Sequence, residues 1–172
     1  MSPKELVRAA CAELGADVVV RWCVTVLSGG PWEGEVLDFI GGPAAKNKAW
    51  LANPSNQYWC RVWAARALLY VWTPSVAPTV VAALNDEAWR VREMAAKVAR
   101  LRDLGEAGDV LSTLVEDETP RVRVAAVRAL ALVGEAEHAE AVTDAQDDPD
   151  SAVRNAAILA LQQMSDRLDR PL

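Results

Sequence analysis

The hydrophobic and polar positions of this chain repeat with a period of 31 residues over its C-terminal two thirds. Three copies open on an aspartate, at Asp86, Asp117 and Asp148, and Ser55 holds the same position one period earlier. A valine–arginine pair follows five or six residues after each aspartate, and apolar residues then recur at the spacing of one helical face. The pattern therefore predicts a series of amphipathic helices, one at the start of each copy.

Each copy continues past a helix breaker into a second, shorter apolar stretch, so each copy predicts a pair of helices. Pro74, Gly105 and Gly134 separate the two stretches in successive copies. The openers Ser55, Asp86 and Asp117 are predicted N-caps, because serine and aspartate side chains accept free backbone N–H groups at a helix start. The apolar columns of the first helix are Ala64, Ala95, Ala126 and Ala157, then Ala67, Val98, Ala129 and Ala160, then Leu68, Ala99, Leu130 and Leu161.

One helix pair cannot bury its own apolar face, so successive pairs are expected to stack and share a core. The period, the Val-Arg pair and the alanine columns, clearest from Asp117 to Val133, resemble the short HEAT repeats of the phycobilisome-lyase type. The resemblance covers about residues 55–164. It implies an all-α fold, a right-handed α-solenoid (superhelix) of two-helix HEAT-like repeats. It identifies no particular function, because solenoids of this kind serve many.

Residues 1–54 lack the period, and their breakers delimit separate helices instead. Gly-Gly-Pro stands at 29–31 and again at 41–43. We expect helices over Pro3–Leu14, Asp17–Leu27, Glu33–Ile40 and Ala44–Ala52. The predicted organisation is one continuous domain, with irregular N-terminal helices over 1–54 (degenerate repeats or a cap), HEAT-like repeats over 55–164 and a C-terminal tail over 165–172.

One arginine recurs in every copy. A ladder of cations could bind phosphates or an acidic peptide. In the alternative, structural interpretation, each arginine bridges neighbouring repeats by bonding to an opener aspartate or to a helix-end carbonyl. We favour the structural ladder, because a binding site rarely needs the residue in every copy and because the resemblance implies the same role. Its members are Arg61, Arg92, Arg123 and Arg154, with Asp86, Asp117 and Asp148.

The charges and the aromatic residues single out the middle of the chain. Residues 1–43 carry a net charge of −3, residues 44–102 carry +6 and residues 103–172 carry −9, within a total of −6. Most of the tryptophans and tyrosines lie in the basic stretch. A charge asymmetry of this size can indicate an interaction surface.

Two interpretations of these aromatic residues stay open. In one, they pack the junction between the irregular N-terminal helices and the regular repeats, which we favour for Trp22, Trp32 and Trp72. In the other, some of them line a groove together with basic side chains and act as binding hot spots. The predicted contact residues are Trp59, Trp63, Arg66, Trp89, Arg90 and Lys97.

The residue types that catalysis or metal binding needs are sparse. His138 is the only histidine, and its setting, Glu137-His138-Ala139-Glu140, predicts an exposed helix residue rather than a ligand. Cys11, Cys23 and Cys60 are widely spaced and are predicted to be small buried apolar residues. No glycine-rich phosphate loop is present. We therefore predict no catalytic residue, no metal site and no cofactor.

These observations favour a non-catalytic protein–protein interaction scaffold that presents a solenoid groove to a partner protein or peptide. One alternative is a nucleic-acid-binding module. Its basic, tryptophan-rich middle is similar in kind to that of HEAT-like alkylation-repair glycosylases, although acidic stretches flank it. Another alternative is a structural subunit that self-assembles, for example as a homodimer through a terminal repeat.

No apolar run is long enough for a membrane span, and the opening Met-Ser-Pro-Lys-Glu does not resemble a signal peptide. We therefore expect no membrane partner and a cytoplasmic location.

Overall fold

The computed structural model describes all residues, 1–172, and consists of α-helices and short 3-10 turns without any strand. The all-α prediction is thus confirmed. The chain forms two compact units, unit 1 (Met1–Ala83) and unit 2 (Leu84–Leu172). None of the helices combines the length and the apolar character that crossing a membrane would need.

Unit 1 holds the irregular helices and the first repeat. Its first helix matches the predicted range, and the second begins one residue earlier than predicted. The helix predicted over Ala44–Ala52 is instead two helices, because the Asn47 side chain accepts the Trp50 N–H and starts a new one. The helices are α1 (Pro3–Leu14), α2 (Ala16–Leu27), α3 (Glu35–Ile40), α4 (Gly42–Ala45), α5 (Lys48–Ala52), α6 (Tyr58–Ala67) and α7 (Ala77–Ala83).

The core of unit 1 forms where α1, α2, α3 and α6 pack together. The ring of Trp63 lies against the backbone of Gly41, and a Cβ on that glycine would lie 3.0 Å from the ring. Space, rather than backbone conformation, therefore requires glycine at this position, whose φ is −77°. The irregular segment is thus closely packed on the first regular helix.

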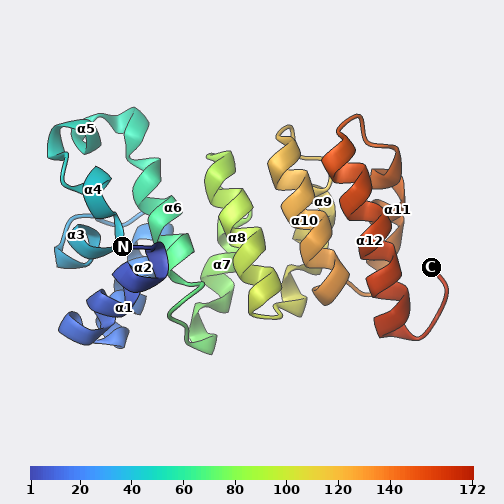
Figure 1. The fold of residues 1–172 in the computed structure, drawn as a ribbon, viewed down its shortest axis with the longest axis horizontal. Coiled ribbons are helices and arrows are strands. Elements are labelled where there is room, and N and C mark those ends of the chain that lie inside the picture. Colours follow the sequence, from blue (N-terminus) through green and yellow to red (C-terminus); the bar gives the residue numbers. More distant parts are fainter. The chain divides into compact units, whose positions relative to one another are not determined.

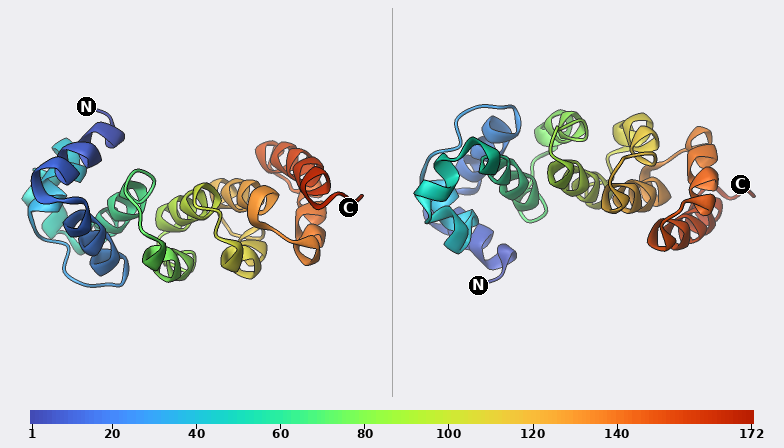
Figure 2. Two further views of the ribbon diagram at one scale, coloured as in Figure 1. Left: turned by 90° about the horizontal axis from the view of Figure 1, so that it is seen from below. Right: turned by 90° about the horizontal axis from the view of Figure 1, so that it is seen from above.

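Unit 2 is built from the regular repeats in two layers (Figures 1 and 2). The first helix of each pair lies in one layer, and α10 packs between its two neighbours there. Ala95, Ala126 and Ala157, one on each of these helices, are fully buried, and their small side chains let the helices approach closely. The first layer is α8 (Trp89–Leu101), α10 (Pro120–Val133) and α12 (Ser151–Leu168), and the second is α9 (Gly108–Leu114) and α11 (Ala139–Asp144).

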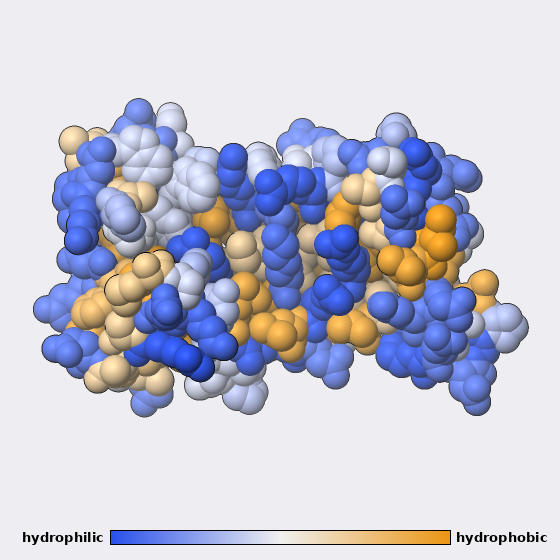
Figure 3. All heavy atoms as spheres, in the orientation of Figure 1, coloured by the Kyte–Doolittle hydropathy of each residue, from blue (hydrophilic) through white to orange (hydrophobic).

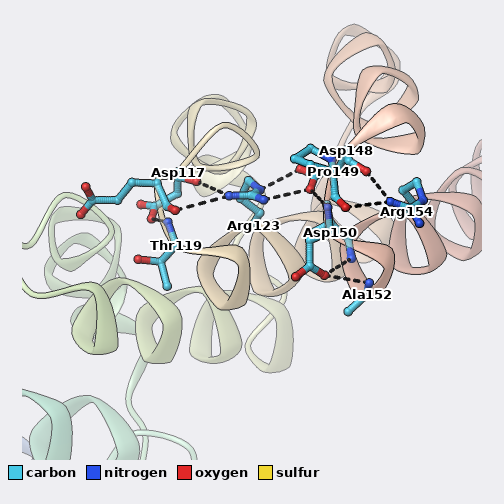
Figure 4. A network of polar contacts seen from close by, with 10 residues as sticks. Asp117, Thr119, Arg123, Asp148, Pro149, Asp150, Ala152 and Arg154 are labelled. Carbon is cyan, nitrogen blue, oxygen red and sulfur yellow. Dashed lines mark hydrogen bonds and ion pairs between the residues drawn. The ribbon is translucent and has the colours of Figure 1, made fainter.

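Two of the repeated arginines join neighbouring repeats of unit 2 through the same set of bonds. Arg92 donates from Nε and Nη2 to the carboxylate of Asp117, at 2.7 and 3.1 Å. Arg123 donates to Asp148 in the same way, at 2.7 and 2.9 Å. Arg92 also donates from Nη1 to the Asp86 carbonyl of its own repeat. Arg123 donates in the same way to the Asp117 carbonyl (Figure 4). Each guanidinium therefore connects two repeats.

The ion pairs of the ladder shift the pKa values of Asp148, Arg123 and Arg92. The hydrogen bond from Arg123 holds the pKa of Asp148 below its ordinary value, and the same bond raises the pKa of Arg123. Hydrogen bonding to Asp117 likewise raises the pKa of Arg92. Both partners are therefore charged at neutral pH, where charge-assisted hydrogen bonds of this kind are strongest.

The openers are not the N-caps that the sequence predicts. The N-cap residues of α8, α10 and α12 are Ala88, Thr119 and Asp150, two residues after each opener. The opener carboxylate instead accepts the N–H of the residue two positions on, for example Thr119 N–H at Asp117. Ser55 lies in a 3-10 turn and caps no helix. The prediction failed because, in Asp117 and Asp148, the carboxylate both closes a local turn and receives an arginine from the preceding repeat.

Candidate functional site

A groove crosses the first helices of unit 2. Its main hollow has a volume of about 440 Å³. Basic side chains from α8 and α10 line it, at Lys97, Arg100, Arg121 and Arg128, above a floor that includes Val124 and Ala125. Glu93, Pro120, Asp150 and Ala152 complete the lining.

A second hollow of about 230 Å³ shares Arg100 and Arg128 with the first, so the two are adjoining parts of the groove. The floor of this part is apolar, made by Ala131, Ala156, Leu159 and Ala160, with Gln163 beside them. Leu159 is 64% exposed, although its side chain is large and apolar. Figure 3 shows this face of unit 2, with hydrophilic side chains over α8 and α10 beside hollows where more hydrophobic atoms are visible.

At the end of the groove near the start of α8, a buried carboxylate organises two of the cations. Glu93 is 7% exposed and accepts from Lys97 Nζ at 2.8 Å and from Arg121 Nη2 at 3.1 Å. The same column of the repeat holds Val62, Val124 and Asn155, so Glu93 is its only charged member. Because a buried charge is costly unless it is paired, this carboxylate fixes Lys97 and Arg121 in place.

Trp89 lies beside this ion-pair cluster. The guanidinium carbon of Arg90 is 4.2 Å from the Trp89 ring centroid, and that of Arg121 is 5.5 Å away. Both distances lie within the range of cation–π attraction. The ring therefore helps to position Arg121, which lines the groove.

The two arginines that line both hollows, Arg100 and Arg128, form no such ion pair or cation–π contact. Arg100 and Arg128 are exposed, and neither forms a hydrogen bond or an ion pair within residues 1–172. Like charges placed near one another in a groove disfavour the free protein, and an anion between them relieves that repulsion. This end of the groove can therefore accept negative charge.

Three of the predicted contact residues lie in unit 1, and one of them belongs to its core. Trp63 is 4% exposed, so its side chain is not accessible to a partner. Trp59 is half-buried, with its ring 6.3 Å from that of Trp63 and 5.5 Å from that of Tyr58. Arg66 donates to the Ile40 carbonyl at 3.2 Å, and burial lowers its pKa. Trp63 and Arg66 thus hold unit 1 together.

The other three predicted contact residues lie in unit 2, at or beside the groove. Lys97 lines it, and Trp89 and Arg90 adjoin the Arg121 side chain. Arg100, Arg121 and Arg128 were missed. The repeat contained a signal for two of them, because Arg121 shares a column with Arg90, and Arg128 shares one with Arg66 and Lys97. Following each column through one more copy would have found both.

His138 is buried, which corrects the prediction of an exposed helix residue. It is 7% exposed, and its Nδ1 accepts the Glu135 N–H at 2.7 Å. Because Nδ1 is an acceptor, the proton of the neutral ring is on Nε2, which donates to Asp109 Oδ1 at 3.1 Å. The polar sequence neighbours were misleading, because the ring packs over Gly108 of the preceding repeat, where an added Cβ would lie 2.6 Å away. The histidine thus links two repeats.

The cysteines are buried in two of three cases. Cys23 and Cys60 are fully buried, and desolvation raises the pKa of Cys23 to about 12 and that of Cys60 to about 11. Cys11 is only half-buried, so the prediction of a buried residue is wrong there.

The chain resembles known proteins in part of its sequence and in its fold. The family model for HEAT repeats matches residues 108–171. This part of the chain is thus similar to HEAT repeats, and the protein is an α-solenoid of helical repeats, as the sequence predicts.

Among solved structures, the chain is similar to the complex of CpcE and CpcF of phycocyanin lyase from Nostoc sp. PCC7120. The TM-score is 0.59 at 19% sequence identity, over 96% of this chain and 66% of the other. This chain thus spans just under two thirds of the length of that protein, and the likeness is one of fold. No curated protein sequence matches the chain.

Proposed function

We propose that the protein is a non-catalytic interaction scaffold that binds an acidic, partly apolar segment of another protein in the groove of unit 2. The observation that carries the proposal is the pair Arg100 and Arg128, which line both hollows without an ionic partner. Two exposed arginines that line the same groove without an acidic partner raise its local positive potential, which attracts an acidic ligand.

The composition of the groove supports a protein segment as the ligand. Cations flank an apolar floor that ends at the exposed Leu159, so a partner needs both carboxylates and apolar side chains. An amphipathic acidic helix offers both on one face. The similar Nostoc structure is a complex of two proteins, which supports assembly with a protein partner.

A fluorescein-labelled helical peptide of glutamate, alanine and leucine, about 20 residues long so that it forms a helix, tests the proposal. Fluorescence anisotropy should show saturable binding that weakens as salt increases. The double variant Arg100→Ala/Arg128→Ala should weaken the affinity by about tenfold or more, since each charge-assisted hydrogen bond contributes about 1.5–3 kcal/mol.

The matched control is Arg8→Ala/Arg21→Ala, which removes two exposed arginines of unit 1 and should leave the affinity unchanged. Equal binding by the groove variant and the native protein would contradict the proposal. Tighter binding of a DNA duplex than of the peptide, through the same two arginines, would support the nucleic-acid alternative instead.

A further inference from the structure

The last repeat helix, α12, exposes a stripe that the preceding helices bury. On α10, Val127 and Leu130 are fully buried, and on α8 the matching Ala96 and Ala99 are too. One period after Val127 comes Ile158, which is 55% exposed, and Leu161 in the next column is half-buried. All of these residues are apolar, so the stripe of α12 differs from those of α8 and α10 in its exposure and not in its polarity.

In the earlier repeats, the next helix of the same layer covers this stripe. Helix α8 is followed in its layer by α10, and α10 by α12, and both pairs pack closely. Helix α10 also packs on α9, while α11 packs on α12, so each first helix rests on the second helix of the preceding pair. Residues 1–172 contain no first helix after α12. A following helix is therefore what covers this stripe in the earlier repeats.

Arg154 lies on the same stripe, one helical turn before Ile158. Its Nη1 donates to the carbonyls of Asp148 and Pro149, at 2.7 and 3.0 Å (Figure 4). Arg123 is held by the matching carbonyls, at Asp117 and Glu118. The guanidinium of Arg154 is thus oriented in the same way as that of Arg123.

The two arginines differ in what their other donors reach. Nε and Nη2 of Arg123 bind the Asp148 carboxylate, whereas no carboxylate within residues 1–172 binds those atoms of Arg154. A guanidinium fork fixed in this orientation is preorganised for a bidentate carboxylate. Arg154 thus has the orientation of Arg123 but lacks the carboxylate that Arg123 binds.

We propose that Arg154, Ile158 and Leu161 form a docking surface for a helical repeat of another protein, one that opens with an aspartate. That aspartate binds Nε and Nη2 of Arg154, and the helix after it covers Ile158 and Leu161. The occupant is identified by continuity with the α8–α10–α12 stack, in which Asp148 and α12 bind α10 in this manner.

A second copy of this chain is a poorer occupant of the surface. In any copy, Asp117 and Asp148 already accept hydrogen bonds from Arg92 and Arg123, and Asp86 is also engaged within its own chain. A copy would have to break one of its own contacts to supply the carboxylate. A partner whose first opener aspartate has no preceding arginine has no such cost.

The experiment uses the full chain and a fluorescein-labelled peptide that copies Asp148–Leu168, the segment that covers the equivalent stripe of α10. Fluorescence anisotropy should show saturable binding. Arg154→Ala should weaken it about tenfold or more, as loss of a charge-assisted pair predicts, and Ile158→Asp should do the same. Leu132→Asp, which changes a 40% exposed leucine of α10, is the matched control and should not change the affinity.

A variant on the peptide keeps the test decisive if a substitution in the protein impairs folding. Replacing the opener of the peptide, Asp148→Asn, should weaken binding to the native protein as strongly as Arg154→Ala does. If neither Arg154→Ala nor Ile158→Asp changes the affinity, the peptide merely displaces α12 from α10, and the proposal is overturned. The absence of saturable binding would overturn it too.

Sedimentation of the native protein tests whether a second copy of this chain covers the surface instead. Concentration-dependent self-association that Ile158→Asp abolishes would mean that a second copy covers the surface, against our proposal. This surface is distinct from the groove of unit 2, so Arg100→Ala/Arg128→Ala should leave binding of the Asp148–Leu168 peptide intact. Failure of one proposal therefore leaves the other standing.

Discussion

Arg123 and Asp148 lie 25 residues apart in the sequence, and two hydrogen bonds of 2.7 and 2.9 Å join them. The guanidinium of Arg123 also reaches a carbonyl of its own repeat, at Asp117. The same arrangement joins Arg92 to Asp117 one repeat earlier. This pairing sets the register of one repeat on the next, because the two N–H donors of a guanidinium bind a carboxylate in only a narrow range of orientations.

Removing one member of this pair should destabilise the protein. Both side chains are about nine-tenths buried, so Arg123→Ala leaves the Asp148 carboxylate without its counter-charge in a poorly solvated site. We expect the free energy of unfolding to decrease by about 2–4 kcal/mol, measured by urea denaturation followed by circular dichroism. Asp148→Ala should have an effect of similar size.

The matched control is the exposed pair of Lys48 and Asp38, whose side chains are 59% and 56% exposed. Lys48→Ala should change the free energy of unfolding by less than about 1 kcal/mol, because solvent screens such a pair. Equal effects at Arg123 and Lys48 would mean that the repeated arginine does not hold the repeats together.

Stability should decrease in acid because of Asp148. The hydrogen bond from Arg123 lowers the pKa of this carboxyl in the folded protein relative to its ordinary value of 3.8. At pH values near and below that ordinary value, the unfolded chain binds a proton more readily than the native protein does. The stabilisation is therefore complete at neutral pH and is lost as the pH falls through the folded-state pKa.

Urea denaturation between about pH 7 and about pH 3 measures this dependence. Asp148→Asn should lower the stability at neutral pH and flatten the curve in acid. The same substitution at the exposed Asp38 shows whether loss of any carboxylate has that effect. A slope in acid that Asp148→Asn leaves unchanged would assign the acid sensitivity to other groups.

Two neighbouring glycines should respond differently to alanine. At Gly108 an added methyl would lie 2.6 Å from the His138 ring, which is buried and fixed by the Glu135 N–H. Gly108→Ala should therefore cost about 1–3 kcal/mol, as overpacking generally does. At Gly105 no atom lies within 4 Å of the added Cβ, so Gly105→Ala should be neutral or slightly stabilising.

Thermal unfolding of the two variants makes the comparison directly. The double variant Gly108→Ala/His138→Ala, compared with His138→Ala alone, shows whether the ring causes the effect. If the methyl at residue 108 costs as much without the ring as with it, the contact is not the reason.

The three cysteines should differ in reactivity towards a thiol reagent. Because burial raises the pKa of Cys23 to about 12 and that of Cys60 to about 11, neither forms a thiolate at neutral pH. In the native protein, Ellman's reagent should modify only Cys11, and in denaturant all three thiols. Cys11→Ser should abolish the native reaction, and rapid modification of the other two would mean that unit 1 opens readily.

Much of the fold follows from local physics that a single sequence carries. The first helices of unit 2 were predicted because apolar residues at helical spacing and alanine columns describe one face of a helix, and the pattern repeats in each copy. The helix Pro3–Leu14 was predicted with both its ends, since a capping box at Ser2 and Gly15 after the last turn act within a few residues. The predicted resemblance to HEAT repeats is confirmed over residues 108–171, where the family model matches.

The groove itself could be predicted only in part. Lys97 was expected among the contact residues, and the structure places it in the lining, whereas Trp63 was expected there and lies in the core of unit 1. A column of the repeat tells which residues share a position, but it does not tell whether neighbouring helices cover that position. The pairing of Glu93 with Arg121, 28 residues away, also depends on which helices pack together.

Tertiary packing also decided the roles of His138 and of the opener aspartates. Sequence neighbours place His138 in a polar segment, but the residue that buries it is Gly108 in the preceding repeat. The sequence suggested both a helix cap and an arginine contact for the openers, and in the structure Asp117 and Asp148 close local turns and receive arginines from the repeat before. Helix periodicity acts over a few residues and can be read along the chain, whereas burial and ion pairing arise between residues that only folding brings together.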